Sequence, residues 1–297
     1  MTSTLQLSNK IGVIVDSFGL PLYEGLKKAK DIGADGVQIY AVSGEMAPEN
    51  MSTSARKELR DYLTSIDLDI SALCGDLGGH GFQNKHDNAL KVEKSKRILD
   101  MAVELGTNIV TTHIGIIPED QNSEIYYALQ QACEELGQYA KGLDAYFAIE
   151  TGPEKAETLK EFLDSLSTNG VSVNFDPANM VMVTGDDPVT GVEILQDYIV
   201  HTHVKDGVQL KKTDPRDVYG FVGYGEGVDH RKIAEMVAAG EYFRELPLGQ
   251  GDVDFDSYFK ALQAVDYTGY LTIEREVKDA PEADISQAVE FIRKYKL

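Results

Sequence analysis

Short runs of β-branched and apolar residues alternate along the chain with longer stretches in which apolar residues recur every three or four positions. The first run is Ile11–Val15, helical spacing through Leu22, Leu26 and Ala29 follows it, and a second run begins at Gly36. A continuous apolar run is typical of a strand buried on both faces, and the longer spacing is typical of an amphipathic helix. The pattern therefore predicts strand and helix units in succession.

The alternation continues to the end of the chain. Strands are predicted near Ile11–Val15, Gly36–Tyr40, Asp69–Ala72, Asn108–Thr112, Tyr146–Ile149, Val171–Phe175, Tyr198–Thr202 and Gly269–Ile273. Helices are predicted in the gaps, for example around Ala55–Ser65, Asn88–Leu105, Ile125–Tyr139, Ala156–Leu166 and Ile285–Tyr295. Gly33 and Gly106 are expected to end two helices in a left-handed conformation.

Strands separated by helices in this number predict an α/β fold, the closed (β/α)8 TIM barrel. An open, doubly wound sheet is the alternative. Its usual glycine-rich phosphate turn after the first strand is missing, because Asp16–Leu20 stand there. We therefore predict a barrel, with residues 1–297 forming a single TIM-barrel domain.

One segment interrupts the alternation at about residues 207–250. This insertion is rich in Gly, Asp and Tyr, and it contains a short helical pattern over His230–Ala239. A loop of this length in a compact domain is usually functional or disordered. Because the insertion follows the seventh strand, it would lie at the C-terminal face of a barrel. A lid is the expected role, and an oligomer contact is the alternative.

Composition narrows the classes of partner. The net charge of −21 repels phosphate backbones and anionic membrane surfaces, so neither nucleic acid nor a membrane is the expected partner. Cys74 and Cys133 stand in apolar or helical surroundings, which fits a reducing compartment without disulfides. The polar N-terminus has no apolar signal core, and no uncharged apolar run is long enough to cross a bilayer. We expect a cytoplasmic protein, and homo-oligomerisation stays open.

Polar side chains follow nearly every predicted strand. They are Asp16, Tyr40, Asp76 with His80, His113, Glu150, Asp176 with Asn179, His201 with His203, Lys205 and Asp206, and Glu274 with Arg275 and Glu276. The C-terminal strand ends of a barrel meet at one mouth, where barrel enzymes keep their chemistry. Several carboxylates converging there with an imidazole would repel each other without a cation. A mostly oxygen ligand set suits Mn²⁺ or Mg²⁺, with Co²⁺ or Zn²⁺ as alternatives.

These residues carry a resemblance. In order they are Ile149-Glu150, Phe175-Asp176-Pro177, His201–Asp206, Pro247–Phe255 and Ile273-Glu274. From the first strand to the last helix, the chain resembles the sugar phosphate isomerase/epimerase group of xylose isomerase-like barrels, which includes ketose 3-epimerases and inosose dehydratases. The resemblance implies one divalent metal ion held by four residues: Glu150, Asp176, His203 and Glu274. It places His201 behind the ligands or against the substrate.

The resemblance also implies a mechanism. The metal chelates a ketone oxygen and a neighbouring hydroxyl, and it stabilises the enediolate that forms when the carbon-bound proton is removed. Glu150 and Glu274 are then the catalytic residues, one removing the proton and the other returning it on the opposite face. If the protein transferred protons on only one face of the carbon, the same site would catalyse isomerisation. If a β-hydroxyl group also left, it would catalyse dehydration.

The chain departs from the 3-epimerase pattern around the sugar. Asn179 stands where a His is common, Gln209 where an Arg often binds substrate, and Ala156 where a Glu is found. The metal ligands of the 3-epimerase pattern are therefore matched better in this chain than its sugar-binding residues. We expect a substrate larger or differently substituted than a free hexulose.

Substrate contacts are predicted from residues at several strand ends. They are His80, His113, Asn179, His201 and Lys205. A histidine satisfied in the core is the alternative for His113, and an ion pair with Asp206 is the alternative for Lys205. The glycine-rich run Cys74–Phe82, which contains His80, is a substrate wall or a simple turn.

We therefore predict a divalent-metal-dependent isomerase or epimerase acting on a ketose or related polyol. The alternative is a lyase on the same scaffold, an inosose-type dehydratase or a C-glycoside-cleaving enzyme. An endonuclease for abasic DNA shares this barrel type, but it holds several zinc ions with many more His than the six here. A sugar-binding subunit without turnover is a further alternative. No cluster of Arg or Lys is evident for phosphate, which favours a neutral polyol as the small-molecule partner.

Overall fold

The computed structural model describes residues 6–224, 235–276 and 280–296, and its parallel strands close into a barrel. Around the barrel the order is β1 (Ile11–Ile14), β10 (Leu271–Ile273), β7 (Ile199–Val204), β6 (Val171–Phe175), β5 (Tyr146–Glu150), β4 (Ile109–Thr112), β3 (Asp69–Cys74) and β2 (Gly36–Tyr40). Pairing of β1 with both β10 and β2 closes the ring. The predicted fold is confirmed, and the predicted strands match with small differences at their ends.

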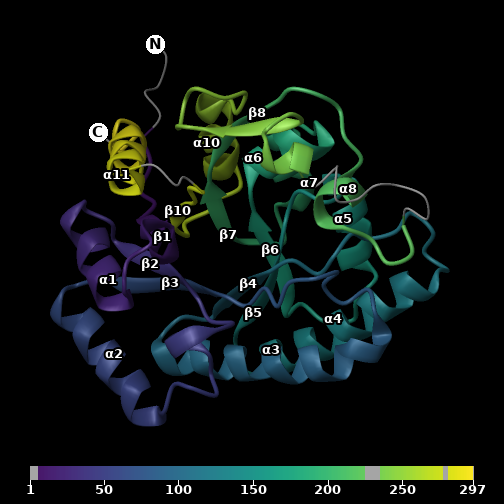
Figure 1. Cartoon of the computed structure of the whole chain (residues 1–297), viewed down its shortest axis with the longest axis horizontal. Coiled ribbons are helices and arrows are strands. Elements are labelled where there is room, and N and C mark those ends of the chain that lie inside the picture. The colour runs from purple at the N-terminus through teal and green to yellow at the C-terminus, as the bar shows by residue number, and fades with distance from the viewer. Residues whose placement is uncertain (1–5, 225–234, 277–279, 297) are drawn as a thin grey trace.

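Helices surround the barrel in Figure 1. They are α1 (Leu22–Asp31), α2 (Thr53–Ser65), α3 (Lys85–Leu105), α4 (Glu124–Gly142), α5 (Ala156–Asp164), α7 (Pro188–Leu195), α10 (Phe255–Ala264) and α11 (Pro281–Arg293). Short helical turns are η1 (Val15–Phe18), η2 (Gly44–Met46), α6 (Pro177–Asn179) and the π-helical η3 (Met180–Thr184). Because the helices cover the outer face and side chains fill the interior, β1 and β6 are buried at every position.

The helix ends follow from local chemistry. Gly33 and Gly106 have φ angles of 87° and 94°, as predicted for glycines that end helices. Helix α3 begins at Lys85, earlier than the predicted Asn88, because the side chain of Asn84 accepts a hydrogen bond from the amide of His86 and caps the helix there.

The strand register is irregular at two places, between Val37 and Gln38 and between Val173 and Asn174. Both Gln38 and Asn174 are almost completely buried inside the barrel. An irregular register re-aims the side chains beside it. The two amide side chains consequently point into the barrel interior, where they meet the site described below.

The insertion contains an antiparallel hairpin of β8 (Asp206–Gln209) and β9 (Phe243–Leu246), with α8 (Pro215–Tyr219) between the strands. Figure 1 shows the hairpin beyond the ends of β6 and β7. Residues 235–238 are helical, and the first part of the helix predicted over His230–Ala239 lies outside the described residues. Across the part of the chain that is described, no helix is both long and apolar enough to span a lipid bilayer.

Candidate metal centre

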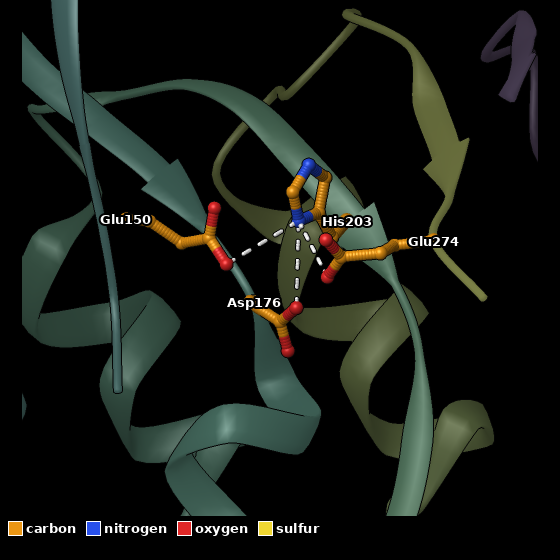
Figure 2. Close-up of side chains that lie close together, drawn as sticks. All are labelled: Glu150, Asp176, His203 and Glu274. Atoms are coloured by element: carbon orange, nitrogen blue, oxygen red, sulfur yellow. Dashed lines mark ion pairs between the residues drawn. The ribbon is translucent and has the colours of Figure 1, made fainter. Parts of the chain in front are cut away.

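Four neighbouring strands deliver one buried cluster. Glu150 ends β5, Asp176 follows β6, His203 is the penultimate residue of β7, and Glu274 follows β10. These strands stand side by side in the barrel, in the order β10, β7, β6, β5. Each residue offers one donor atom, and the donor atoms lie within 4.8 Å of one another. The four predicted metal ligands are thus brought together, and Figure 2 shows the carboxylates converging on the imidazole.

Distances define the centre of the cluster as His203 Nδ1. Its separation from the nearest carboxylate oxygen is 3.6 Å for Glu150, 3.4 Å for Asp176 and 3.3 Å for Glu274. A cation at a typical ligand distance of about 2.0–2.2 Å fits between donors with this spacing.

Gln38 orients the imidazole of His203. Its Oε1 lies 3.0 Å from His203 Nε2, and its Nε2 donates to Thr111 Oγ1 at 3.2 Å, which assigns the amide orientation. His203 Nε2 then donates to Gln38, and Nδ1 faces the three carboxylates, where it carries a proton or, once deprotonated, offers its lone pair to a metal ion. A partner that holds the second ring nitrogen of a metal-binding histidine is typical of such sites.

The two carboxylate oxygens of Asp176 have different roles: one caps a helix and the other faces the cluster. Oδ1 accepts from the amide of Asn179 at 2.9 Å and caps α6. Oδ2 and His203 Nδ1 are both buried and have no hydrogen-bond partner. Two adjacent orphaned ligand atoms are costly in a protein interior. A divalent cation would satisfy both, so the residues present fit a metal ion.

The two glutamates have different partners. Glu150 accepts from Asn174 Nδ2 at 3.1 Å and from Asn179 Nδ2 at 2.9 Å. Glu274 accepts from Lys205 Nζ at 2.9 Å. Amide donors therefore fix Glu150, and an ammonium group fixes Glu274.

Charge dominates the energetics of the cluster. Burial lowers the pKa of His203, but Glu274 and Glu150 outweigh burial and hold that pKa well above its usual value. Burial alone would raise the pKa of Glu274, and Lys205 and His203 instead hold it well below its usual range. Burial raises the pKa of Asp176. Three carboxylates, one ammonium and one divalent cation would sum to zero, so the group is balanced when a metal replaces the proton on His203.

A cavity of about 310 Å³ opens above the cluster. Of the predicted substrate contacts, His113, Asn179 and Lys205 line it. His113 Nε2 lies 3.6 Å from Glu150 Oε1, which puts the ring at the edge of the cluster. The volume is at the lower end of the range of small-molecule sites.

His201 and His80 lie elsewhere. His201 is fully buried below the cluster, where Nδ1 contacts Asn174 Oδ1 at 2.8 Å and Nε2 contacts Thr272 Oγ1 at 3.0 Å. With both ring nitrogens engaged by protein, His201 supports Asn174 and is not placed to contact substrate. His80 is exposed and lies against Gly220 of the insertion.

Lys205 does not form the ion pair with Asp206 that was the alternative to a substrate contact, since its ammonium pairs with Glu274. Asp206 instead accepts four backbone N–H groups at the root of the insertion. A carboxylate so surrounded by amides needs no lysine.

Several residues of the site were not predicted. Tyr219 and Glu245 line the cavity from the insertion, Gln38 lines it from β2, and Asn174 of β6 supports Glu150. The amide residues could have been found as polar positions in otherwise apolar strands. Tyr219 had no such signal, because the part of the insertion around it lacks periodicity.

Glu154, in the loop after β5, supplies a pH-dependent prediction. It is buried with one long contact, 3.5 Å from Ile117 N to its carboxylate, and burial raises its pKa to about 8. A carboxyl with a raised pKa holds its proton better in the folded state, so its contribution to stability falls as pH rises from about 4.5 to 8. Glu154→Gln, which does not titrate, should gain stability relative to wild type between pH 5 and pH 8, by at least ~1 kcal/mol or roughly 2–4 °C in Tm. Melting curves at both pH values check this, with exposed Glu157→Gln as control. A difference independent of pH would contradict it.

An eight-stranded barrel with a buried carboxylate and imidazole cluster at its C-terminal mouth defines a TIM-barrel protein with a candidate metal centre. Residues 26–295 match the family model described as xylose isomerase-like TIM barrel, and the chain belongs to this family. The predicted resemblance is confirmed at that level.

Similar proteins come from sequence and from structure. The inosose dehydratase of Clostridium perfringens is 30% identical over 183 residues, 59% of this chain and 54% of that protein. This chain thus matches about half the length of that relative. A xylose isomerase domain protein from Planctomyces limnophilus has a TM-score of 0.76 at 24% identity, covering 99% of this chain and 98% of the other.

Two further solved structures share the fold. An L-ribulose 3-epimerase has a TM-score of 0.71 at 15% identity, with 97% of this chain and 94% of the other covered. A xylose isomerase-like TIM barrel protein from Mycobacterium smegmatis, in complex with magnesium, has a TM-score of 0.69 at 15% identity, with 97% of each chain covered.

Proposed function

We propose that this protein is a divalent-metal-dependent enzyme that removes a proton from the carbon beside a ketone of a sugar or related polyol and returns it with inversion. The observation that carries the proposal is the convergence of Glu150, Asp176, His203 and Glu274 within 4.8 Å, with orphaned ligand atoms on Asp176 and His203. A magnesium complex of a protein with the same fold supports the choice of a divalent cation.

A divalent cation held by these residues would polarise a ketone oxygen and make the neighbouring C–H bond more acidic. Glu150 and Glu274 stand on strands separated by β6 and β7, so their carboxylates approach the cavity from different sides. One takes the proton from the carbon, the other delivers a proton to the opposite face, and exchange with solvent resets both. Lys205 holds Glu274 in place, and Asn174 and Asn179 hold Glu150.

The cavity lining favours a neutral substrate. Asp76, Glu245 and Glu276 line it in addition to the cluster, and among its described lining residues Lys205 is the one lysine or arginine. Even with a divalent cation bound, the lining keeps an excess of negative charge. A phosphate ester would be repelled, and an uncharged polyol would meet acceptors for its hydroxyl groups.

A dehydratase is the second candidate. The curated relatives named inosose dehydratase favour it. The same proton would be removed beside the ketone, and a β-hydroxyl would take up a proton and leave as water. The cluster serves both reactions up to the departure of the hydroxyl group.

Incubation with L-ribulose and with inosose in D₂O separates the two. Deuterium at the carbon beside the ketone with inversion supports the epimerase, and loss of water supports the dehydratase. Glu150→Gln and Glu274→Gln should each lower the exchange rate by about 10²–10⁴-fold, because each removes a group that moves the proton. Glu157→Gln is the matched control, since Glu157 is exposed and lies outside both the cavity lining and the cluster. Exchange that survives chelation of the metal would overturn the proposal.

A further inference from the structure

The insertion places Tyr219, the last residue of α8, in the wall of the cavity above the cluster. The ring centroids of Tyr219 and His113 are 5.4 Å apart, and the planes are tilted by 49°. The Tyr219 hydroxyl lies 2.7 Å from the position that a Cβ on Gly152 would occupy, and Gly152 has a φ of +138°. Glycine therefore supplies both the space and the conformation that let the tyrosine reach the end of β5, two residues beyond Glu150.

In the described part of the chain, the hydroxyl of Tyr219 has no hydrogen-bond partner. The carboxylates nearby are engaged by Asn174, Asn179 and Lys205. Burial and the charge of Glu150 raise the pKa of Tyr219 well above its usual value, so the hydroxyl keeps its proton. The side chain is half-buried and lines the cavity. Its hydroxyl is therefore available to donate a hydrogen bond to a molecule that occupies the cavity.

Contacts on both sides of Tyr219 hold it in place. Beyond α8, Val222 N donates to Gln83 Oε1 at 2.9 Å, and Gln83 Nε2 donates to Ile116 O at 3.2 Å, which fixes the Gln83 amide. Gly220 packs against His80, because a Cβ at Gly220 would lie 2.8 Å from that ring. The turn that carries Tyr219 is thus docked on the loops after β3 and β4.

The root of the insertion is fixed as well. Arg275, which is 2% exposed, pairs with Glu245 of β9 and donates to Leu246 O at 2.9 Å. Arg275 also pairs with Asp284 of α11. Strand β9 is therefore tied to the barrel directly beside Glu274, and the described parts of the insertion are anchored at Val222 and at β9.

We propose that Tyr219 is a recognition residue of the site and donates a hydrogen bond from its hydroxyl to an oxygen of the substrate. The inference rests on the proposed function, because it takes a sugar or polyol as the occupant of the cavity. It makes the insertion part of the substrate-binding site. It also gives His80 a supporting role, since this ring packs under the turn that carries Tyr219.

Tyr219→Phe tests the inference, with Tyr224→Phe as the matched control. Tyr224 lies in the same insertion, but its ring stacks on Arg216, with 4.2 Å between the guanidinium carbon and the ring centroid. Calorimetry on Mn²⁺-loaded protein measures affinity for L-ribulose and for inosose. Loss of one neutral hydrogen bond should weaken binding of the preferred probe by roughly 3–10-fold, while Mn²⁺ affinity is unchanged. In turnover assays KM should rise by a similar factor with kcat little changed. Tyr224→Phe should behave as wild type.

A second measurement does not depend on substrate. Protein labelled with 3-fluorotyrosine is titrated with Mn²⁺, and the ¹⁹F resonance missing from Tyr219→Phe identifies Tyr219. Paramagnetic Mn²⁺ in the cluster should broaden this resonance more strongly than that of Tyr224, because Tyr219 lines the cavity above the cluster and Tyr224 does not. A Tyr219 resonance that stays sharp in Mn²⁺-loaded protein overturns the inference.

The two proposals fail in different ways. If wild type binds a probe and Tyr219→Phe binds it equally well, the recognition role is overturned and the proposed function stands. If wild type binds Mn²⁺ but neither probe, and shows no exchange in D₂O, the proposed function fails and the recognition of a polyol by Tyr219 falls with it.

Discussion

Asp176→Asn is expected to abolish stabilisation of the protein by divalent metal and to lower turnover by about 10²–10³-fold or more. The substitution is selective because the two oxygens of Asp176 have separate tasks. Asparagine keeps an Oδ1 that caps the amide of Asn179, now at 2.9 Å. Its NH₂ group replaces the orphaned Oδ2 and points a donor at the centre of the cluster, where a cation cannot accept it.

Thermal melts with and without metal measure the effect. A ligand that binds only the folded state at about a hundred times its Kd stabilises by about 2.7 kcal/mol, so wild type should show a clear rise in Tm with Mn²⁺ or Mg²⁺. Asp176→Asn should show none. Its metal-free form should be no less stable than wild type, because burial raises the pKa of Asp176 and makes its charge costly there.

Asp187→Asn controls for the loss of a helix-capping carboxylate. Asp187 caps α7 through the amides of Val189 and Thr190, and it is exposed and outside the cluster. This variant should keep the full metal-dependent rise in Tm. If the Tm of the wild-type protein is unchanged by Mn²⁺, Mg²⁺, Co²⁺ and Zn²⁺, the proposed metal centre is refuted.

The barrel and the cluster were predictable because their signals are local. Apolar runs mark each strand, and a polar residue at the C-terminal end of a run marks a group at the barrel mouth, as Glu150 does for β5. The C-terminal ends of parallel barrel strands meet at one mouth, and this does not depend on the conformation of the loops. This is why carboxylates on separate strands could be expected at one mouth without any knowledge of distances. The choice of Glu150, Asp176, His203 and Glu274 among the polar strand ends came from the resemblance to xylose isomerase-like barrels.

His201 shows the limit of that reasoning. Strand alternation puts His201 and His203 on the same face of β7, and both do point into the barrel. Two residues along a strand span about 6.6 Å, which separates one layer of the interior from the next. His203 consequently reaches the mouth, and His201 lies one layer below among Asn174 and Thr272. Depth along the strand depends on the stagger of the barrel, and this is not visible in a single strand.

Tyr219 was beyond prediction for a different reason. Its place depends on contacts with loops far away in sequence, such as that of Val222 with Gln83 and that of its own ring with His113. No periodic pattern marks an insertion held by such contacts. The alternative for Lys205, an ion pair with Asp206, was wrong for a related reason, because its neighbour in sequence is not its partner in space.

Asp206→Asn is expected to destabilise the protein by about 2–4 kcal/mol. Asp206 is completely buried, and its carboxylate accepts from Gly207 at 2.9 Å, Val253 at 3.2 Å, and Gly249 and Gly251 at 2.8 Å each. Asparagine has a single acceptor oxygen. Its NH₂ group would face two of the four backbone donors, which would lose their acceptor and meet the N–H bonds of the new amide instead.

The glycines around Asp206 show how closely this loop is fitted. A Cβ on Gly251 would stand 2.2 Å from Asp206 Oδ1, and Gly249 has a φ of +80°. The loop cannot move away to accommodate an amide without losing the other contacts. Because the same loop leads from β9 into α10, its disturbance should also loosen the root of the insertion.

Chemical unfolding of Asp206→Asn against Asp252→Asn measures the effect. Asp252 lies in the same loop and is exposed, so its substitution should change the free energy of unfolding by less than about 0.5 kcal/mol. If the insertion does depend on this root, the Tyr219 resonance should also lose its Mn²⁺ broadening in Asp206→Asn, at temperatures where the barrel remains folded. Equal unfolding free energies for the two variants would show that the four amide contacts of Asp206 contribute no net stability.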